Sequence, residues 1–153
     1  MGNTTKEVYI KMAAICSRSE QCSTDILKKI TGYGIEGDQA GQIIEKLREE
    51  NFLDDERYVK AYVRDKFRIN KWGRIKMRYY LRAKGLKDET IEKGFEEINA
   101  ENYKDVLIKT MKDKAKTVKK KTRFEKMGQI IRFAQNRGFE PELIHRYMSF
   151  VIE

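Results

Sequence analysis

One short motif, glycine followed by an apolar residue, occurs three times in this chain: Gly34-Ile35, Gly85-Leu86 and Gly138-Phe139. The glycines are 51 and 53 residues apart. Each glycine is followed six residues later by a further apolar residue, which is Ala40, Ile91 or Ile144. Self-similarity at a nearly constant period is typical of repeat proteins, in which each unit buries its apolar face against its neighbours. The repeated motif therefore predicts an array of similar units and argues against an enzyme.

The repeated glycines are also expected to end helices. A helix commonly ends with a glycine in the left-handed conformation, and the hydrophobic residue after it packs back onto the last turn. Ile35, Leu86 and Phe139 occupy that following position. A new helix should begin about two residues further on, and Pro141, at a first-turn position in the last copy, supports this.

The rest of the chain has the pattern of nearly continuous helix. Pro141 is the only proline in 153 residues. Apolar residues recur at spacings of three and four, as in Ile43, Ile44 and Leu47, whereas strand-like alternation is scarce. We therefore expect an all-α fold in which each helix buries one apolar stripe.

A second kind of boundary lies between the glycines. The stretch Asn51-Phe52-Leu53-Asp54-Asp55-Glu56-Arg57-Tyr58 places an acidic cluster where a helix would start, with Asp54 as the candidate cap. The corresponding boundary in the next unit is expected at residues 102–105, so each unit should contain three helices. The sequence thus predicts three tandem three-helix modules, over residues 1–50, 54–98 and 101–153, that form an elongated, curved array.

The charge balance favours a polyanionic partner. The chain has 33 Lys and Arg against 24 Asp and Glu, a formal charge of +9. Residues 61–93 hold 11 basic and 4 acidic residues and are the most electropositive part. Such a balance suits nucleic acid or an acidic protein surface. The two cysteines make no disulfide framework, and no signal peptide or membrane span is recognisable, so we expect a cytoplasmic protein without a membrane partner.

Several motifs are specific when taken in order. Besides the stretch 51–58, they are Arg18-Ser19-Glu20, Gly73-Arg74-Ile75, Leu81-Arg82-Ala83-Lys84-Gly85-Leu86 and Arg137-Gly138-Phe139-Glu140-Pro141-Glu142-Leu143-Ile144. Through them the chain resembles the RecX family of regulatory proteins, from about residue 18 to the C-terminus. That family consists of tandem three-helix modules, in agreement with the repeat. Cys22 departs from the usual aliphatic residue, and Glu140 departs from the usual small hydroxyl cap.

The resemblance implies a non-enzymatic regulator that acts in homologous recombination, DNA repair and the SOS response. RecX proteins bind the RecA recombinase assembled on single-stranded DNA and commonly inhibit its strand exchange, ATP turnover and co-protease activity. The implied partners are the RecA filament and nucleic acid, the latter contacted through phosphates. We expect a monomer that carries no cofactor.

A basic segment supplies the main candidate interface. Residues 64–87 hold ten Lys or Arg against one acid, and Arg74, Arg78 and Arg82 follow at four-residue steps on one helical face. Like charges so placed repel each other, which favours an anionic partner; an ordinary solvated face is the alternative. The predicted filament- or DNA-binding residues are Arg64, Lys66, Arg68, Lys71, Trp72, Arg74, Lys76, Arg78, Arg82 and Lys84.

Apolar residues on the same segment have two interpretations. Trp72 fits either stacking on a base or anchoring an interface between modules. Ile75, Tyr79 and Ala83 form a second apolar stripe beside that of Met77. Packing between adjacent modules would explain this second stripe.

A secondary basic patch follows further along the chain. Its residues are Lys112, Lys116, Lys119, Lys120, Lys121 and Arg123. Lysines favour non-specific attraction to phosphate over the reading of bases. A solvated hinge between the second and third modules explains the run equally well.

No combination of residues indicates catalysis or a metal site. His145, the only histidine, has no nucleophile partner in the sequence, and Cys16 and Cys22 lack the paired spacing of a zinc site. Helix capping explains the acidic cluster at 54–56 better than a hard cation does. Two other classes of function stay open: a general helical binder of single- or double-stranded nucleic acid without a filament-specific contact, and a helical-repeat scaffold for an unrelated protein.

Overall fold

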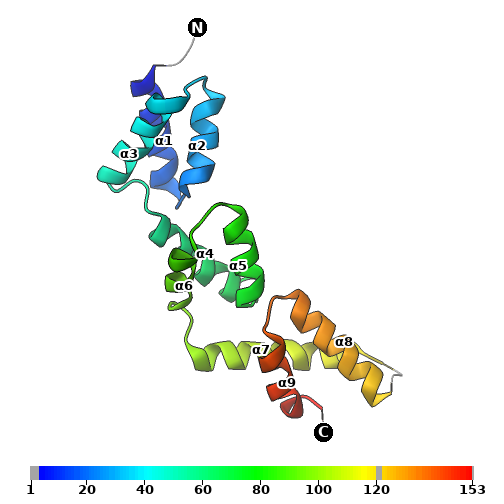
Figure 1. Cartoon of the computed structure of the whole chain (residues 1–153). Helices are drawn as coiled ribbons and strands as arrows, with labels where there is room; N and C mark the ends of the chain where they lie inside the picture. Colours follow the sequence, from blue (N-terminus) through cyan, green and yellow to red (C-terminus); the bar gives the residue numbers. More distant parts are fainter. Residues whose placement is uncertain (1–3, 120–121, 153) are drawn as a thin grey trace. The chain divides into compact units, whose positions relative to one another are not determined.

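The computed structural model describes residues 4–119 and 122–152. Within them lie nine α-helices and a final 3-10 turn, η1 (Met148–Phe150), and no strand (Figure 1). The helices are α1 (Thr5–Arg18), α2 (Ser23–Gly32), α3 (Gly37–Glu49), α4 (Asp55–Arg68), α5 (Arg74–Ala83), α6 (Asp88–Phe95), α7 (Ala100–Thr117), α8 (Arg123–Asn136) and α9 (Pro141–Tyr147). The all-α prediction is confirmed. None of these helices is long and apolar enough to cross a membrane.

The three repeated glycines end helices as predicted. Gly34, Gly85 and Gly138 have φ angles of 85°, 85° and 97°, and the apolar residue after each is buried. At the last of them, the N–H of Gly138 donates to the carbonyl of Gln135 and that of Phe139 to the carbonyl of Ala134. This pair of bonds satisfies carbonyls that the end of α8 would otherwise leave unpaired.

Of the two helix starts predicted between the glycines, one is confirmed and one is wrong. Asp54 caps α4 as predicted, because its Oδ1 accepts the N–H of Arg57 at 3.1 Å. The boundary expected at residues 102–105 is wrong, since these residues lie inside α7. The cap of α7 is Asn99, whose Oδ1 accepts the N–H groups of Glu101 and Asn102. A short amide side chain caps a helix as well as a carboxylate does, so the earlier polar residue starts the helix.

The chain divides into two compact units. The N-terminal unit comprises Met1–Ala61 and Arg82–Gly94, and the C-terminal unit comprises Tyr62–Leu81 and Phe95–Glu153. Helices α4, α5 and α6 therefore contribute residues to both units. The division into three modules of three helices stays a prediction.

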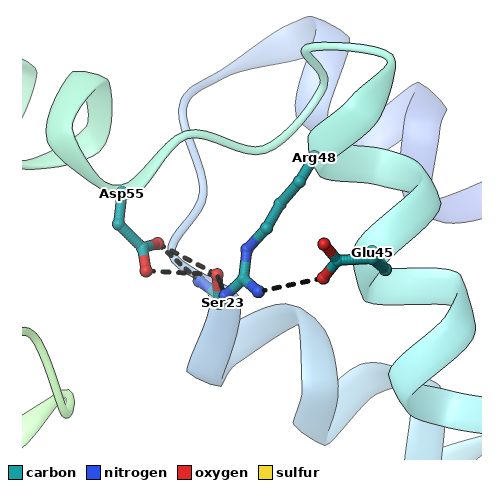
Figure 2. A network of polar contacts seen from close by, with 4 residues as sticks. All are labelled: Ser23, Glu45, Arg48 and Asp55. Atoms are coloured by element: carbon teal, nitrogen blue, oxygen red, sulfur yellow. Dashed lines mark hydrogen bonds and ion pairs between the residues drawn. The ribbon is translucent and has the colours of Figure 1, made fainter.

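In the N-terminal unit, a side chain of α4 caps α2. The residue before α2 is the buried Cys22, which makes no side-chain capping bond. Instead, Asp55 accepts both the N–H of Ser23 at 3.0 Å and its hydroxyl at 3.1 Å (Figure 2). Arg48 of α3 donates to the same hydroxyl and pairs with Glu45. The departure at Cys22 is thus offset by a carboxylate from a distant helix start.

The C-terminal unit is built around α7. Helix α7 packs against α8 and α9, and its Tyr103, Leu107 and Met111 are buried together with Ile130 and Phe139. In the same unit, the backbone at the start of α5 is hydrogen-bonded to the residues that follow α8. Helix α5 buries Met77 and Leu81, whereas its Ile75, Tyr79 and Tyr80 are exposed.

Candidate functional site

The whole basic excess of the chain lies in one unit. The N-terminal unit contains 13 Lys and Arg against 14 Asp and Glu, a net charge of −1. The C-terminal unit contains 20 against 10, a net charge of +10. A surface that attracts polyanions is therefore expected on the C-terminal unit.

Two glycines bring the start of α5 against the end of α8. The N–H of Gly73 donates to the carbonyl of Arg137 at 2.7 Å, and the N–H of Ile75 donates to that of Gly138 at 2.9 Å. A Cβ atom on Gly73 would lie 2.4 Å from the Gly138 carbonyl oxygen. Only glycines allow the two backbones to approach so closely. The motifs around residues 73 and 138 thus form one structural feature.

Arg74 is held by a network beside these glycines. Its guanidinium pairs with Glu140 at 2.7 Å and lies 3.9 Å from the centre of the Tyr103 ring. The hydroxyl of Tyr103 donates to Glu140 and accepts the N–H of Arg74 at 3.0 Å. Burial, followed by the bond to Glu140, raises the pKa of the Tyr103 phenol. Glu140, which makes no capping bond at α9, instead anchors α5.

The other two arginines of the predicted stripe also have partners inside the chain. Arg78 lies over the ring of Phe95 at 5.1 Å, and Arg82, in the N-terminal unit, pairs with Asp88 at 2.7 Å. These contacts and the Arg74 pair offset the charge repulsion that suggested an anionic partner. Their role in binding stays a prediction.

Lys84 is likewise paired within the N-terminal unit. It lies 2.8 Å from Asp25. The bond to Asp25 raises the pKa of Lys84. Burial raises the pKa of Asp25. The hydrogen bond to Lys84 and the charge of Lys84 lower it by more, so the net shift is downward.

The remaining basic residues of the segment surround aromatic rings and a groove. The ammonium groups of Lys66 and Lys76 lie 4.8 Å and 4.6 Å from the centre of the Trp72 ring. Exposed Arg64, Arg68 and Lys71 line a cavity of about 330 Å³, whose lining also includes Phe67 and the acidic residues Glu97 and Asp105. Two of these cations thus lie at Trp72, and three line the cavity.

The Trp72 ring stacks on Tyr80, with centroids 5.3 Å apart and planes at 25°. Tyr79 meets Tyr80 edge-on. Ile75 and Tyr79 are exposed, so within the C-terminal unit their stripe is not buried, and packing between modules stays a prediction.

Sequence reasoning missed a second basic cavity. Its volume is about 400 Å³, and its lining includes Lys71, Lys114 and Arg137 around the ring of Phe133. The ammonium of Lys114 and the guanidinium of Arg137 lie 5.1 Å and 4.9 Å from that ring. Arg137 stands next to a glycine interpreted only as a helix end, and no spacing links it to Lys71.

The secondary basic patch is only partly described. Lys112 and Lys116 lie on α7, Arg123 begins α8, and these three and Lys119 are exposed. Lys120 and Lys121 lie outside the described residues. Because α7 and α8 belong to the same unit, the interpretation of the whole run as a hinge between modules is wrong. Its binding role is untested.

The candidate catalytic and metal residues do not converge. His145 is exposed on α9, whereas Cys16 and Cys22 are buried in the N-terminal unit. Among residues 4–119 and 122–152, no three His, Cys, Asp or Glu side chains are grouped so as to hold a metal ion.

Comparisons with known proteins agree with the motif resemblance. Residues 54–94 match a family model described as "RecX, second three-helix domain". The chain is 29% identical over 118 residues to "Regulatory protein RecX" of Clostridium perfringens strain 13, covering 76% of this chain and 55% of the relative. It is 26% identical over 148 residues to the protein of that name from Clostridium botulinum strain Eklund 17B, covering 94% and 69%. The chain spans about half the length of the Clostridium perfringens relatives.

Solved structures show the same fold. "Crystal structure of RecX from Lactobacillus salivarius" matches with a TM-score of 0.88 at 18% identity and covers 96% of each chain. "Crystal structure of regulatory protein RecX" matches with a TM-score of 0.86 at 19% identity, covering 95% of this chain and 71% of the other. The resemblance to the RecX family is confirmed, and the relatives named here are regulatory proteins.

Proposed function

We propose that this RecX-like chain is a non-enzymatic regulator that binds the RecA nucleoprotein filament and inhibits its recombinase, ATPase and co-protease activities. The single observation that carries the proposal is the similarity to RecX proteins along 94% of the chain. The protein acts as a monomer in the cytoplasm, where the filament forms. Its contacts are with RecA itself and with DNA phosphates.

The charge of the C-terminal unit supports a role for phosphate contacts. Exposed Arg64, Arg68 and Lys112 form no ion pair with a carboxylate among the described residues, in contrast to Arg74, Arg82 and Lys84. Cations without internal partners can neutralise phosphates at the smallest energetic cost, because no existing pair has to be broken. We therefore assign the first group to binding and Arg74 mainly to the fold.

The test is the RecA-dependent ATPase on single-stranded DNA, with the full chain titrated in. We expect turnover to fall to a plateau, and no effect at saturation would contradict the proposal. Reversal of Arg64, Arg68 and Lys112 to Glu should weaken the inhibition. The matched control reverses three exposed cations of the N-terminal unit, Lys6, Lys28 and Lys29, and should inhibit like the wild type.

The net charge of +10 on one unit favours a second candidate, a general nucleic-acid-binding protein without a filament-specific contact. This alternative predicts equal affinity for naked DNA and for the filament. It also predicts that log affinity falls steeply with log salt, by about 0.7 for each phosphate neutralised on a single strand. Tighter binding to the filament at the same salt concentration would reject it.

A further inference from the structure

The exposed side of α5 carries more aromatic surface than a solvated helix face needs. Tyr79 is 69% exposed, and Tyr80 and Ile75 are 43% and 44% exposed. Tyr79 and Tyr80 are consecutive and Ile75 lies about one helical turn before them, whereas Met77 and Leu81 of the same helix are fully buried. A contiguous patch of this kind, unlike scattered apolar residues, indicates a binding surface.

The rings are arranged in a fixed order. Tyr80 stacks on Trp72 with planes at 25°, and Tyr79 packs edge-on against Tyr80 at 85°, each pair with centroids 5.3 Å apart. Trp72 therefore does not offer both of its faces to a ligand, because Tyr80 covers one of them. The aromatic surface open to a ligand belongs to Tyr79 and Tyr80, with Trp72 behind them.

Two cations border these rings. Lys66 and Lys76 hold their ammonium groups within 5 Å of the Trp72 ring centre. Neither makes an ion pair with a carboxylate in the part of the chain that the structure describes; Lys76 reaches only the carbonyl oxygen of Asn136, at 3.4 Å. Their charge is thus available to an anion beside Trp72, the ring on which Tyr80 stacks.

We propose that Tyr79 and Tyr80, backed by Trp72 and flanked by Lys66 and Lys76, form a stacking platform for unpaired bases of single-stranded nucleic acid. Exposed aromatic rings beside cations suit this ligand, because every base has a π face and every nucleotide a phosphate. A duplex hides its base faces in the helical stack and cannot use the platform. The inference rests on the proposed function only for its biological setting, since it requires no contact with RecA.

The test measures binding of the full chain to labelled oligonucleotides by fluorescence anisotropy. Three ligands of equal length are compared: an oligothymidylate, a duplex, and a strand of abasic sites with the same phosphates but no bases. We expect the oligothymidylate to bind best. Tyr79→Ala with Tyr80→Ala should lower its affinity roughly 5- to 150-fold, the range for loss of one stacked base, and leave the abasic strand unaffected.

Two variants serve as controls. Tyr79→Phe with Tyr80→Phe keeps the rings and should retain the affinity. Phe150→Ala removes another exposed aromatic residue of the same unit, which also has a lysine near its ring, and should bind like the wild type. The circular dichroism spectrum of each variant shows whether the helices persist.

Equal binding of the oligothymidylate and the abasic strand would overturn the platform, as would unchanged affinity in the double alanine variant. Loss of RecA inhibition with unchanged DNA binding would also overturn it, and would place a protein partner on this surface. Failure of the filament proposal gives a different result: DNA binding remains sensitive to both tyrosines while the RecA ATPase is unaffected.

Discussion

The N-terminal and C-terminal units are both built from α-helices but differ in net charge and in how far their cations are paired with carboxylates. In the N-terminal unit, Arg57, Lys84 and Lys93 pair with Glu20, Asp25 and Glu56, and the net charge is −1. In the C-terminal unit the net charge is +10, because its cations outnumber its carboxylates two to one. Units with the same repeated backbone pattern can therefore differ in surface charge: one is nearly neutral, and the other is strongly electropositive.

The repeated glycines also differ between the two units, in the space around the position of a Cβ atom. Gly34 in the N-terminal unit has open space where a Cβ would stand, although its φ is 85°. A Cβ on Gly138 in the C-terminal unit would lie 2.4 Å from the Cβ of Lys76. One glycine serves only to end a helix, whereas the other also lets two helices meet.

The largest expected effect comes from Gly138→Ala, because it combines two costs. A positive φ costs a non-glycine residue about 1–2 kcal/mol, and overpacking against Lys76 adds about 1–3 kcal/mol. Gly34→Ala should incur only the first of these. Urea unfolding followed by the fluorescence of Trp72, the only tryptophan, measures the C-terminal unit, and circular dichroism follows both variants. Equal losses of stability in the two variants would contradict the comparison.

Glu140→Ala should destabilise the C-terminal unit by roughly 1–3 kcal/mol, because it leaves the Arg74 guanidinium and the Tyr103 hydroxyl without their shared acceptor. The midpoint and slope of urea unfolding are the measurement. Glu142→Ala, which removes an exposed carboxylate two residues further on, in α9, is the control and should change stability little. Similar losses in both variants would mean that the network contributes nothing specific.

Removal of lysines that form no ion pair with any described carboxylate should change the salt dependence of DNA binding. Lys112→Gln with Lys119→Gln in the C-terminal unit should lower the slope of log affinity against log salt by about 0.7 for each phosphate that is no longer neutralised. The paired comparison is Lys28→Gln with Lys29→Gln in the N-terminal unit, which removes the same charge and should leave the slope unchanged. Equal changes in slope would show that only net charge matters.

The smallest effect concerns the Asp25–Lys84 pair of the N-terminal unit. Because the folded pKa of Asp25 is lowered, the pair stabilises the fold above the unfolded value of about 4, and this contribution disappears as pH falls through the lowered pKa. Lys84→Met should therefore cost up to about 1 kcal/mol at pH 7 and less at pH 3. Urea unfolding by circular dichroism at both pH values checks this. A loss that is the same at both would contradict the linkage, and Lys87→Met is the control.

The helices were predictable because their ends depend on local chemistry. A glycine that adopts a positive φ and a carboxylate that accepts an N–H three residues later act within one turn, so Gly85 and Asp54 could be interpreted without tertiary structure. The start of α7 was missed because Asn99 precedes the stretch that looked like the repeat. Capping depends on the first suitable side chain rather than on the repeat register.

The candidate site was predictable only in part. The basic segment at residues 64–87 was found from charge, but the partners that occupy Arg74 and Lys84 lie 66 and 59 residues away in the chain. Tyr79 was interpreted as a packing residue because its helical spacing from Ile75 and Ala83 is the same for a buried stripe and for an exposed one. Exposure depends on which other helices are near, and a helical period does not encode that.

The sequence by itself determined the all-α class, the glycine-terminated helices and the excess of positive charge, because these follow from local backbone preferences and from composition. The tertiary structure alone decided which cations are neutralised internally and which aromatic rings face solvent. The physical reason is that ion pairs and burial depend on distances between side chains far apart in the chain. Arg74 and Lys76 are two residues apart in sequence, and Arg74 is paired with Glu140 whereas Lys76 lies over the Trp72 ring.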